Sequence, residues 1–261
     1  MSPAFELSSR DEKEIADVRG WGRHAKPASA KRWKKGGSAM ELARSWTGDQ
    51  GLEALRLLLD EVTGSAGFEV SRGIAGARTS FDGFRGSRTH DLLLIGEAAA
   101  GTTVVSIEGK VDEGFGQTVE QYRGAARRKV GRNQSTNALD RLQGLTYAIA
   151  GWEAGAAPRR LALPFQLFGA IAGAVAAAVD EEADQAVLCI HELTPKRTDE
   201  QKRQQNERDL RDFIHVVFGE IVTGDDPSWI VGPLKLHGGS ERIPASIPFY
   251  VAKLSTPPAP G

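Results

Sequence analysis

The clearest strand signals in this chain lie in the stretch HDLLLIGEAAAGTTVVSIEGK, residues 90–110. Residues 91–95 and 102–110 are rich in leucine, isoleucine, valine and threonine, a composition typical of β-strands. The connection between them, GEAAAG, begins and ends with glycine, as hairpin connections often do. The sequence therefore predicts two neighbouring antiparallel strands here.

Three charged side chains lie at the open end of this predicted hairpin. If the hairpin turns symmetrically about residues 96–101, Asp91 lies opposite Ser106. Side chains alternate with a period of two along a strand, so Glu108 and Lys110 share the face of Ser106. We therefore expect Asp91, Glu108 and Lys110 to converge on one surface. His90 adjoins Asp91 and would point to the opposite side if it lay in the strand.

Asp91 and Glu108 have the chemistry of a divalent-cation site. Two carboxylates separated by a diagonal of about 7–8 Å can hold Mg²⁺ or Mn²⁺, which complete their shells with water and phosphate oxygens. Such an ion assists phosphodiester hydrolysis by polarising the phosphoryl group and activating a bound water. Lys110 would position or deprotonate that water, or stabilise the transition state. The competing interpretation is a surface ion pair at a strand end, worth about 1 kcal/mol or less.

The pattern of Asp followed by Glu-x-Lys, here HD at 90–91 and IEGK at 107–110, resembles that of the PD-(D/E)XK nuclease superfamily. The resemblance implies an α/β protein with a restriction-endonuclease-like αβββαβ core, in which helices flank a mixed central sheet. It covers about residues 40–193. Members often have proline before the aspartate, whereas His90 stands here.

The predicted elements follow the order of that core. They are helix 51–62, strands near 68–77, 91–95 and 102–110, helix 117–130 and strand 186–192. Helices predicted within 137–152 and 161–179 form a helical insertion before the last core strand. A charged helix at 198–222 and two closing strands form C-terminal additions.

The resemblance also implies further site residues. In the superfamily the helix after the lysine strand often supplies a glutamine or tyrosine, and Gln117 and Gln121 are the candidates here. Tyr122 is a weaker match because it follows Gln117 by five residues rather than four. A carboxylate on the first helix is another recurring feature, for which Glu53 is best placed.

The chain divides into three parts by composition. Residues 1–37 are polar and predict a flexible basic arm, residues 38–255 a single nuclease-like domain, and residues 256–261 a disordered tail. The arm's cations could contact phosphates, with tryptophans interleaved. They are Lys31, Arg32, Lys34 and Lys35.

Composition excludes several other classes of protein. A net charge of -1 argues against a dedicated nucleic-acid coat protein, and a single cysteine, Cys189, against a disulfide framework. The N-terminus lacks the pattern of a secretory signal, and residues 161–179 are interrupted by polar and helix-breaking residues. We therefore expect a cytoplasmic protein that has no membrane partner.

The main functional hypothesis is an endo- or exonuclease that depends on Mg²⁺ or Mn²⁺. Its partner would be nucleic acid, DNA in the first place, and the protein could be a homodimer. The alternative is a catalytically inactive module of the same fold that binds nucleic acid or takes part in assembly. A phosphate-handling enzyme of another type is disfavoured, because the chain has no Gly-x-x-x-x-Gly-Lys-Ser/Thr loop.

Overall fold

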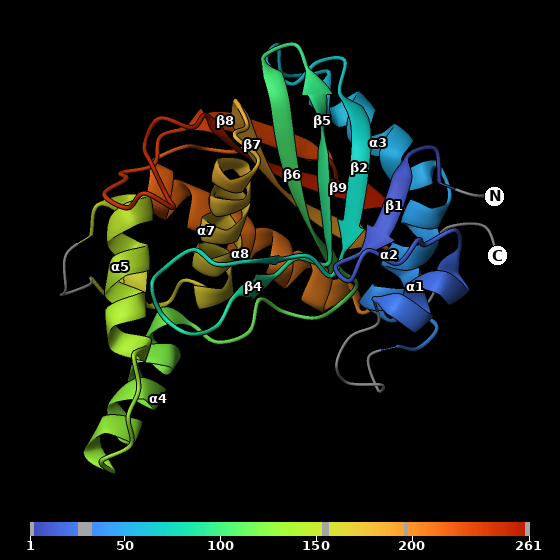
Figure 1. The fold of residues 1–261 in the computed structure, drawn as a ribbon. Helices are drawn as coiled ribbons and strands as arrows, with labels where there is room; N and C mark the ends of the chain where they lie inside the picture. The colour runs from blue at the N-terminus through green and yellow to red at the C-terminus, as the bar shows by residue number, and fades with distance from the viewer. Residues whose placement is uncertain (1–2, 26–32, 153–156, 196–197, 259–261) are drawn as a thin grey trace.

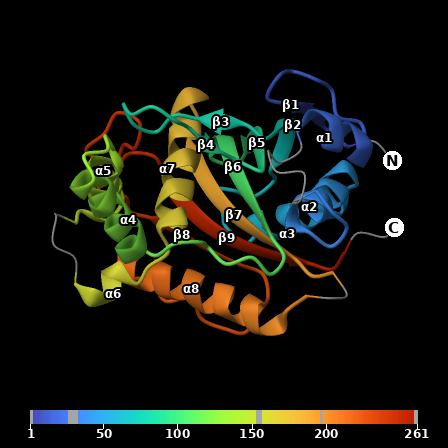
Figure 2. The ribbon, with the colours of Figure 1, turned by 90° about the horizontal axis from the view of Figure 1, so that it is seen from below.

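A seven-stranded mixed sheet forms the centre of the molecule, in the order β1-β2-β5-β6-β7-β9-β8. A computed structural model describes residues 3–25, 33–152, 157–195 and 198–258. Helices lie against both faces of the sheet (Figures 1 and 2). The predicted α/β class is confirmed.

The elements match most of the predicted ones within a few residues. The strands are β1 (Glu6–Ser9), β2 (Glu69–Ala75), β3 (Arg78–Thr79), β4 (Arg88–Thr89), β5 (Leu92–Ala98), β6 (Gly101–Lys110), β7 (Gln185–Leu193), β8 (Trp229–Leu234) and β9 (Phe249–Thr256). The helices are α1 (Val18–His24), α2 (Ser38–Thr47), α3 (Gln50–Leu59), α4 (Val119–Gly131), α5 (Ala138–Ala150), α6 (Pro158–Leu161), α7 (Phe165–Asp180) and α8 (Glu200–Phe218).

The β5–β6 hairpin has a tighter turn than the sequence suggested. Both strands extend into the GEAAAG connection, and Ala98 pairs with Gly101. The register places Leu93 opposite Ser106, so the expected pairing of Asp91 with Ser106 is wrong by two residues. Continuing the ladder by one residue brings Asp91 level with Glu108. Because the shift is even, the predicted sharing of a face survives.

Two hydrophobic cores cover the two faces of the sheet. Consecutive residues of β6, such as Val104 and Val105, are fully buried on opposite sides of the sheet. Val104 packs in the core formed with α5, α7 and α8, and Val105 in the core formed with α1, α2 and α3. Strands β6, β7 and β9 run parallel and are covered on both faces, which explains why nearly all of their residues are buried.

The helix that crosses between the parallel strands β6 and β7 is α7, not α4. Helix α7 packs on both strands, whereas α4 packs on α5 and α6. The reason is composition: α7 is rich in alanine and buried along most of its length, while α4 has only two buried residues. Residues 117–130 were predicted as the second helix of the αβββαβ core, but the helix that packs on β6 and β7 is α7. None of the helices in the described part of the chain combines the length and the hydrophobicity that a membrane-spanning helix needs.

The N-terminal segment belongs to the domain, so the prediction of a flexible arm over residues 1–37 is wrong for the part described. Strand β1 pairs in parallel with β2, and helix α1 follows it. Leu7, Ile15 and Trp21 are buried, which ties the segment to the core. Sequence reasoning overlooked them because these apolar residues are widely spaced in a polar stretch.

The two ends of the predicted domain need similar adjustment. Lys34 and Lys35 are exposed in a turn before α2, while Lys31 and Arg32 lie outside the described residues. Strand β9 includes Thr256, the first residue of the predicted tail, and residues 259–261 lie outside the description. The C-terminal additions complete the sheet, since β9 pairs with β7 and β8 with β9.

Candidate functional site

Asp91, Glu108 and Lys110 come together where β5 begins and β6 ends. Asp91 precedes β5, and its Oδ2 accepts a hydrogen bond of 2.9 Å from the main-chain N–H of Gly109. Glu108 and Lys110 are 5% and 7% exposed on the face that carries α7. The hairpin positions the three side chains because strand pairing fixes their spacing and alternation fixes their face.

The surroundings of Asp91 disfavour the charged form of its carboxyl group. Its side chain reaches solvent, yet the protein around it removes much of its hydration. This desolvation, followed by the negative charge of Glu108, raises the pKa of Asp91 to about 7; the Gly109 N–H and the charges of Lys110 and Arg88 act in the opposite direction. A cation between the two carboxylates would relieve their repulsion.

Arg88 of β4 forms an ion pair with Glu108 that sequence reasoning missed. The two side chains are 18% and 7% exposed. Helix α7 leaves room for the arginine through Gly173, because a Cβ there would lie 2.7 Å from Arg88 Cγ. No sequence signal marked Arg88, since β4 is only two residues long and lies in a glycine-rich loop.

Gln166, in the first turn of α7, bridges the glutamate and the lysine. Its Nε2 lies 3.4 Å from Glu108 Oε2, and its Oε1 accepts from Lys110 Nζ at 3.4 Å. The ammonium of Lys110 also lies 5.1 Å from the centre of the Phe115 ring. The glutamine at the site therefore comes from α7, whereas the resemblance implied one from α4.

The other residues suggested by the resemblance lie elsewhere. Gln121 forms a capping box with Thr118 at the start of α4, with hydrogen bonds of 3.0 and 3.2 Å. Gln117 is exposed, and its carbonyl accepts from the N–H of Phe165. Glu53 is exposed on α3, on the opposite side of the sheet. The structure brings none of the three to Glu108.

His90 lies on the same side of the sheet as the carboxylates; it was expected to point away only if it lay in the strand. It belongs to neither β4 nor β5, so strand alternation does not apply to it. Its Nδ1 lies 2.6 Å from Ser106 Oγ and its Nε2 lies 3.0 Å from Thr79 Oγ1. Burial, then the positive charge of Arg88, lowers its pKa to about 3. His90 is therefore neutral and supports the base of the site.

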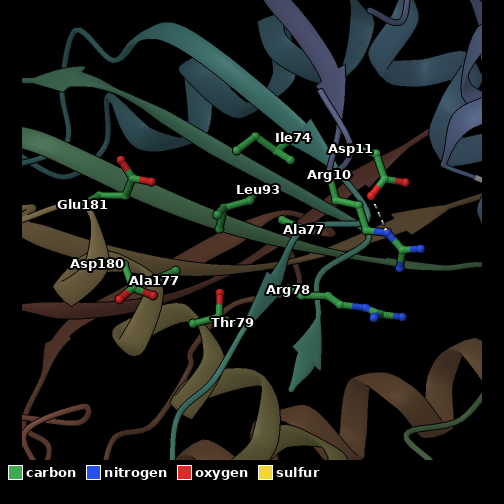
Figure 3. Close-up of a pocket in the computed structure, with 10 residues that line it drawn as sticks. All are labelled: Arg10, Asp11, Ile74, Ala77, Arg78, Thr79, Leu93, Ala177, Asp180 and Glu181. Carbon is green, nitrogen blue, oxygen red and sulfur yellow. Dashed lines mark ion pairs between the residues drawn. The ribbon is translucent and has the colours of Figure 1, made fainter. Parts of the chain in front are cut away.

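A cavity of about 500 Å³ lies beside the hydrogen-bonded side chains of His90 and Thr79, between the edge of the sheet and the end of α7 (Figure 3). Its apolar lining includes Ile74 and Leu93, and its charged lining includes Arg78 and Glu181. Thr79 lies in its wall and joins it to the site through the hydrogen bond with His90. The cavity is a neighbouring space and does not contain Asp91 or Glu108.

A buried ionic network continues the polar surface from Lys110 across β7 and β9. Lys110 is level with Glu192 in the β6–β7 register. Glu192 pairs with Lys253 at 3.3 Å and with Arg203 of α8 at 3.0 Å, and Lys253 also pairs with Glu207 at 2.5 Å. These ion pairs link α8 to β7 and β9 beside the site.

The donors available for a metal ion are the two carboxylates. Asp91 and Glu108 offer hard oxygen atoms, which Mg²⁺ and Mn²⁺ prefer, and the pKa of Asp91 is raised first by desolvation and then by the nearby charge of Glu108. Within the described residues no group of three or more His, Cys, Asp or Glu could hold a metal ion. The residues fit an ion that keeps water or phosphate oxygens in its shell, and Arg88 would have to leave Glu108 to admit it.

Comparison with known proteins places the chain in a family without assigning it an activity. No curated protein and no solved structure matches it. A family model described as a domain of unknown function, DUF6946, matches residues 14–256 and so includes the whole candidate site. The chain therefore belongs to the DUF6946 family.

Proposed function

We propose that this protein is a Mg²⁺-dependent or Mn²⁺-dependent nuclease that hydrolyses phosphodiester bonds in DNA. The observation that carries the proposal is the juxtaposition of Asp91, Glu108 and Lys110 across β5 and β6, with Gln166 between the glutamate and the lysine. The arrangement matches the chemistry of the superfamily that the sequence resembles. A restriction-endonuclease-like arrangement of the sheet is part of the same proposal.

The side chains have separate roles in this proposal. Asp91 and Glu108 hold the divalent cation, which would activate water and offset charge on the phosphate. Lys110 places a positive charge beside the carboxylates, where it orients the attacking water or stabilises the transition state. Gln166 holds Lys110 and Glu108 in place, while the buried Lys110 stem and Phe115 exclude bulk water from one side.

A second candidate is a non-catalytic nucleic-acid-binding module of the same fold. The ion pair between Arg88 and Glu108 favours it, because an arginine beside the glutamate competes with a metal ion for the same carboxylate. The two candidates differ in metal binding. A nuclease takes up Mn²⁺ at Asp91 and Glu108, whereas the non-catalytic module keeps Arg88 there.

The test measures cleavage of nucleic acids with and without divalent metal ions. Purified protein is incubated with duplex DNA, single-stranded DNA and RNA in Mg²⁺, Mn²⁺ or EDTA. We expect cleavage of DNA that stops in EDTA and is lost in Asp91→Ala and Glu108→Ala. Glu53→Ala is the matched control, since it removes an exposed carboxylate from the other side of the sheet. Cleavage that persists in EDTA or in both site variants would refute the assignment.

A further inference from the structure

Helix α4 carries a concentration of positive charge that the candidate site does not use. Residues 119–132 hold five cations and one carboxylate, Glu120, a net charge of +4 in a chain whose net charge is -1. The five cations, called here the α4 basic face, are Arg123, Arg127, Arg128, Lys129 and Arg132. In the described part of the chain none of them has an ion-pair partner, whereas nearby Arg141 and Arg159 are paired with aspartates.

The packing of α4 turns these cations toward solvent. The helix contacts α5 and α6 and buries only Val119 and Ala126. Four of the five cations are exposed and Arg123 is half-buried. In Figure 1 the helix extends away from the sheet. The α4 basic face is therefore a projecting surface rather than a set of charges that hold the domain together.

The first turn of α4 is fixed beside the candidate site. The N–H of Val119 donates to the carbonyl of Leu163 at 2.9 Å, and the ring of Tyr122 stacks on Phe165 with 3.7 Å between centroids. Phe165 directly precedes Gln166, the residue that bridges Glu108 and Lys110. From this anchor the 13 residues of α4 span about 20 Å. The helix thus leads from the site outward.

We infer that the α4 basic face is the docking surface for duplex DNA, with α4 lying in the major groove and its cations on the phosphates of the groove walls. The inference rests on the proposed function and names the contact that would deliver DNA to the site. A helix about 10–12 Å across fits a major groove about 12 Å wide. A membrane surface is disfavoured, because Val130 is the only large apolar side chain among the exposed residues of α4.

The size of the expected effect follows from counterion release. Each phosphate contact adds about 0.9 to the slope of log K against log salt for duplex DNA. Replacing three of the five cations should therefore reduce the slope by about 2.7 and weaken binding at about 0.1 M salt by tenfold or more. The predicted change is large enough to separate direct contacts from the general loss of charge.

The experiment measures binding of a fluorescent 20-base-pair duplex by anisotropy over a range of salt, in EDTA so that cleavage does not enter. The test variant combines three substitutions, Arg127→Ala, Arg128→Ala and Lys129→Ala. The charge-preserving variant combines Arg127→Lys and Arg128→Lys and keeps Lys129. The matched control replaces three exposed cations of the N-terminal segment on the other side of the molecule. These are Lys13→Ala, Arg19→Ala and Arg23→Ala.

The outcomes separate this inference from the proposed function. Loss of binding and of slope in the test variant alone, with the charge-preserving variant near wild type, supports α4 docking even if the protein cleaves nothing. Equal losses in the test variant and the matched control, unchanged binding in the test variant, or no duplex binding by the wild type would overturn it. So would tighter binding to phosphatidylserine vesicles than to the duplex. If the protein binds the duplex through α4 but does not cleave DNA, that result would count against the proposed function only.

Discussion

Replacing Arg88 with methionine tests whether this arginine competes with a metal ion for Glu108. Methionine keeps a flexible stem of similar shape beside Gly173 of α7 and removes the charge that pairs with Glu108. We expect two effects of opposite sign. Without divalent cations the variant should be less stable than the wild type, and it should bind Mn²⁺ more tightly.

The magnitudes follow from the burial of the pair. Removing one partner of a buried ion pair costs about 3–5 kcal/mol, because the remaining charge is left uncompensated. The Arg88 side chain is 18% exposed, so solvent screens part of this effect and we expect a loss of about 2–3 kcal/mol in the free energy of unfolding. Releasing Glu108 from even a weak pair is worth about 1 kcal/mol, which corresponds to Mn²⁺ affinity at least about fivefold higher.

The assay is urea unfolding with and without Mn²⁺, combined with calorimetric Mn²⁺ titration. A ligand that binds only the folded state stabilises it, so Mn²⁺ should restore part of the stability that Arg88→Met loses. Arg44→Met is the matched control, since Arg44 pairs with the buried Glu41 on α2, on the opposite side of the sheet. It should lower stability without changing Mn²⁺ affinity. Unchanged or weaker Mn²⁺ binding by Arg88→Met would refute the competition.

Three further predictions concern catalysis, the N-terminal segment and acid stability. Lys110→Ala should keep Mn²⁺ binding but lower single-turnover cleavage by about 10² or more, and a near-wild-type rate would remove the lysine from the mechanism. Deleting residues 1–25 should lower the free energy of unfolding by at least about 3 kcal/mol, because Trp21 leaves the core; an unchanged urea midpoint would contradict this. Burial lowers the pKa of His191 to about 3, so only the unfolded chain binds its proton between that pH and about 6.5. As the pH falls below 6.5, His191 should lower the free energy of unfolding by up to about 1.4 kcal/mol per pH unit. Urea titrations at several pH values should show that His191→Asn abolishes this contribution.

Strand pairing made part of the candidate site predictable. Asp91, Glu108 and Lys110 lie in one hairpin, and a period of two fixes which side chains share a face whatever the exact register. The predicted register was wrong by two residues, yet the convergence held because an even shift preserves the face. Gln166 and Arg88 were not predictable in this way. Gln166 reaches the site from α7, far along the chain, and Arg88 reaches it from the two-residue strand β4, which is not part of the hairpin.

The helix that crosses between β6 and β7 is another feature that local sequence patterns could not predict. Local pattern identified α4, α5 and α7 as helices, but could not say which of them lies on β6 and β7. The choice depends on which helix can bury its surface against two apolar strands, and the alanine-rich α7 does so. The consequence for the site was direct, because the bridging glutamine came from α7 instead of Gln117 or Gln121.

Patterns among neighbouring residues were enough to predict the α/β class, most of the helices and strands, and the shared face of Asp91, Glu108 and Lys110. The tertiary structure alone decided which distant groups meet: Arg88 with Glu108, Gln166 with Lys110, and β1 with β2. The physical reason is that periodicity and hydrogen bonding within an element act over a few residues. Contacts between elements instead depend on how all the apolar surfaces of the chain are buried together.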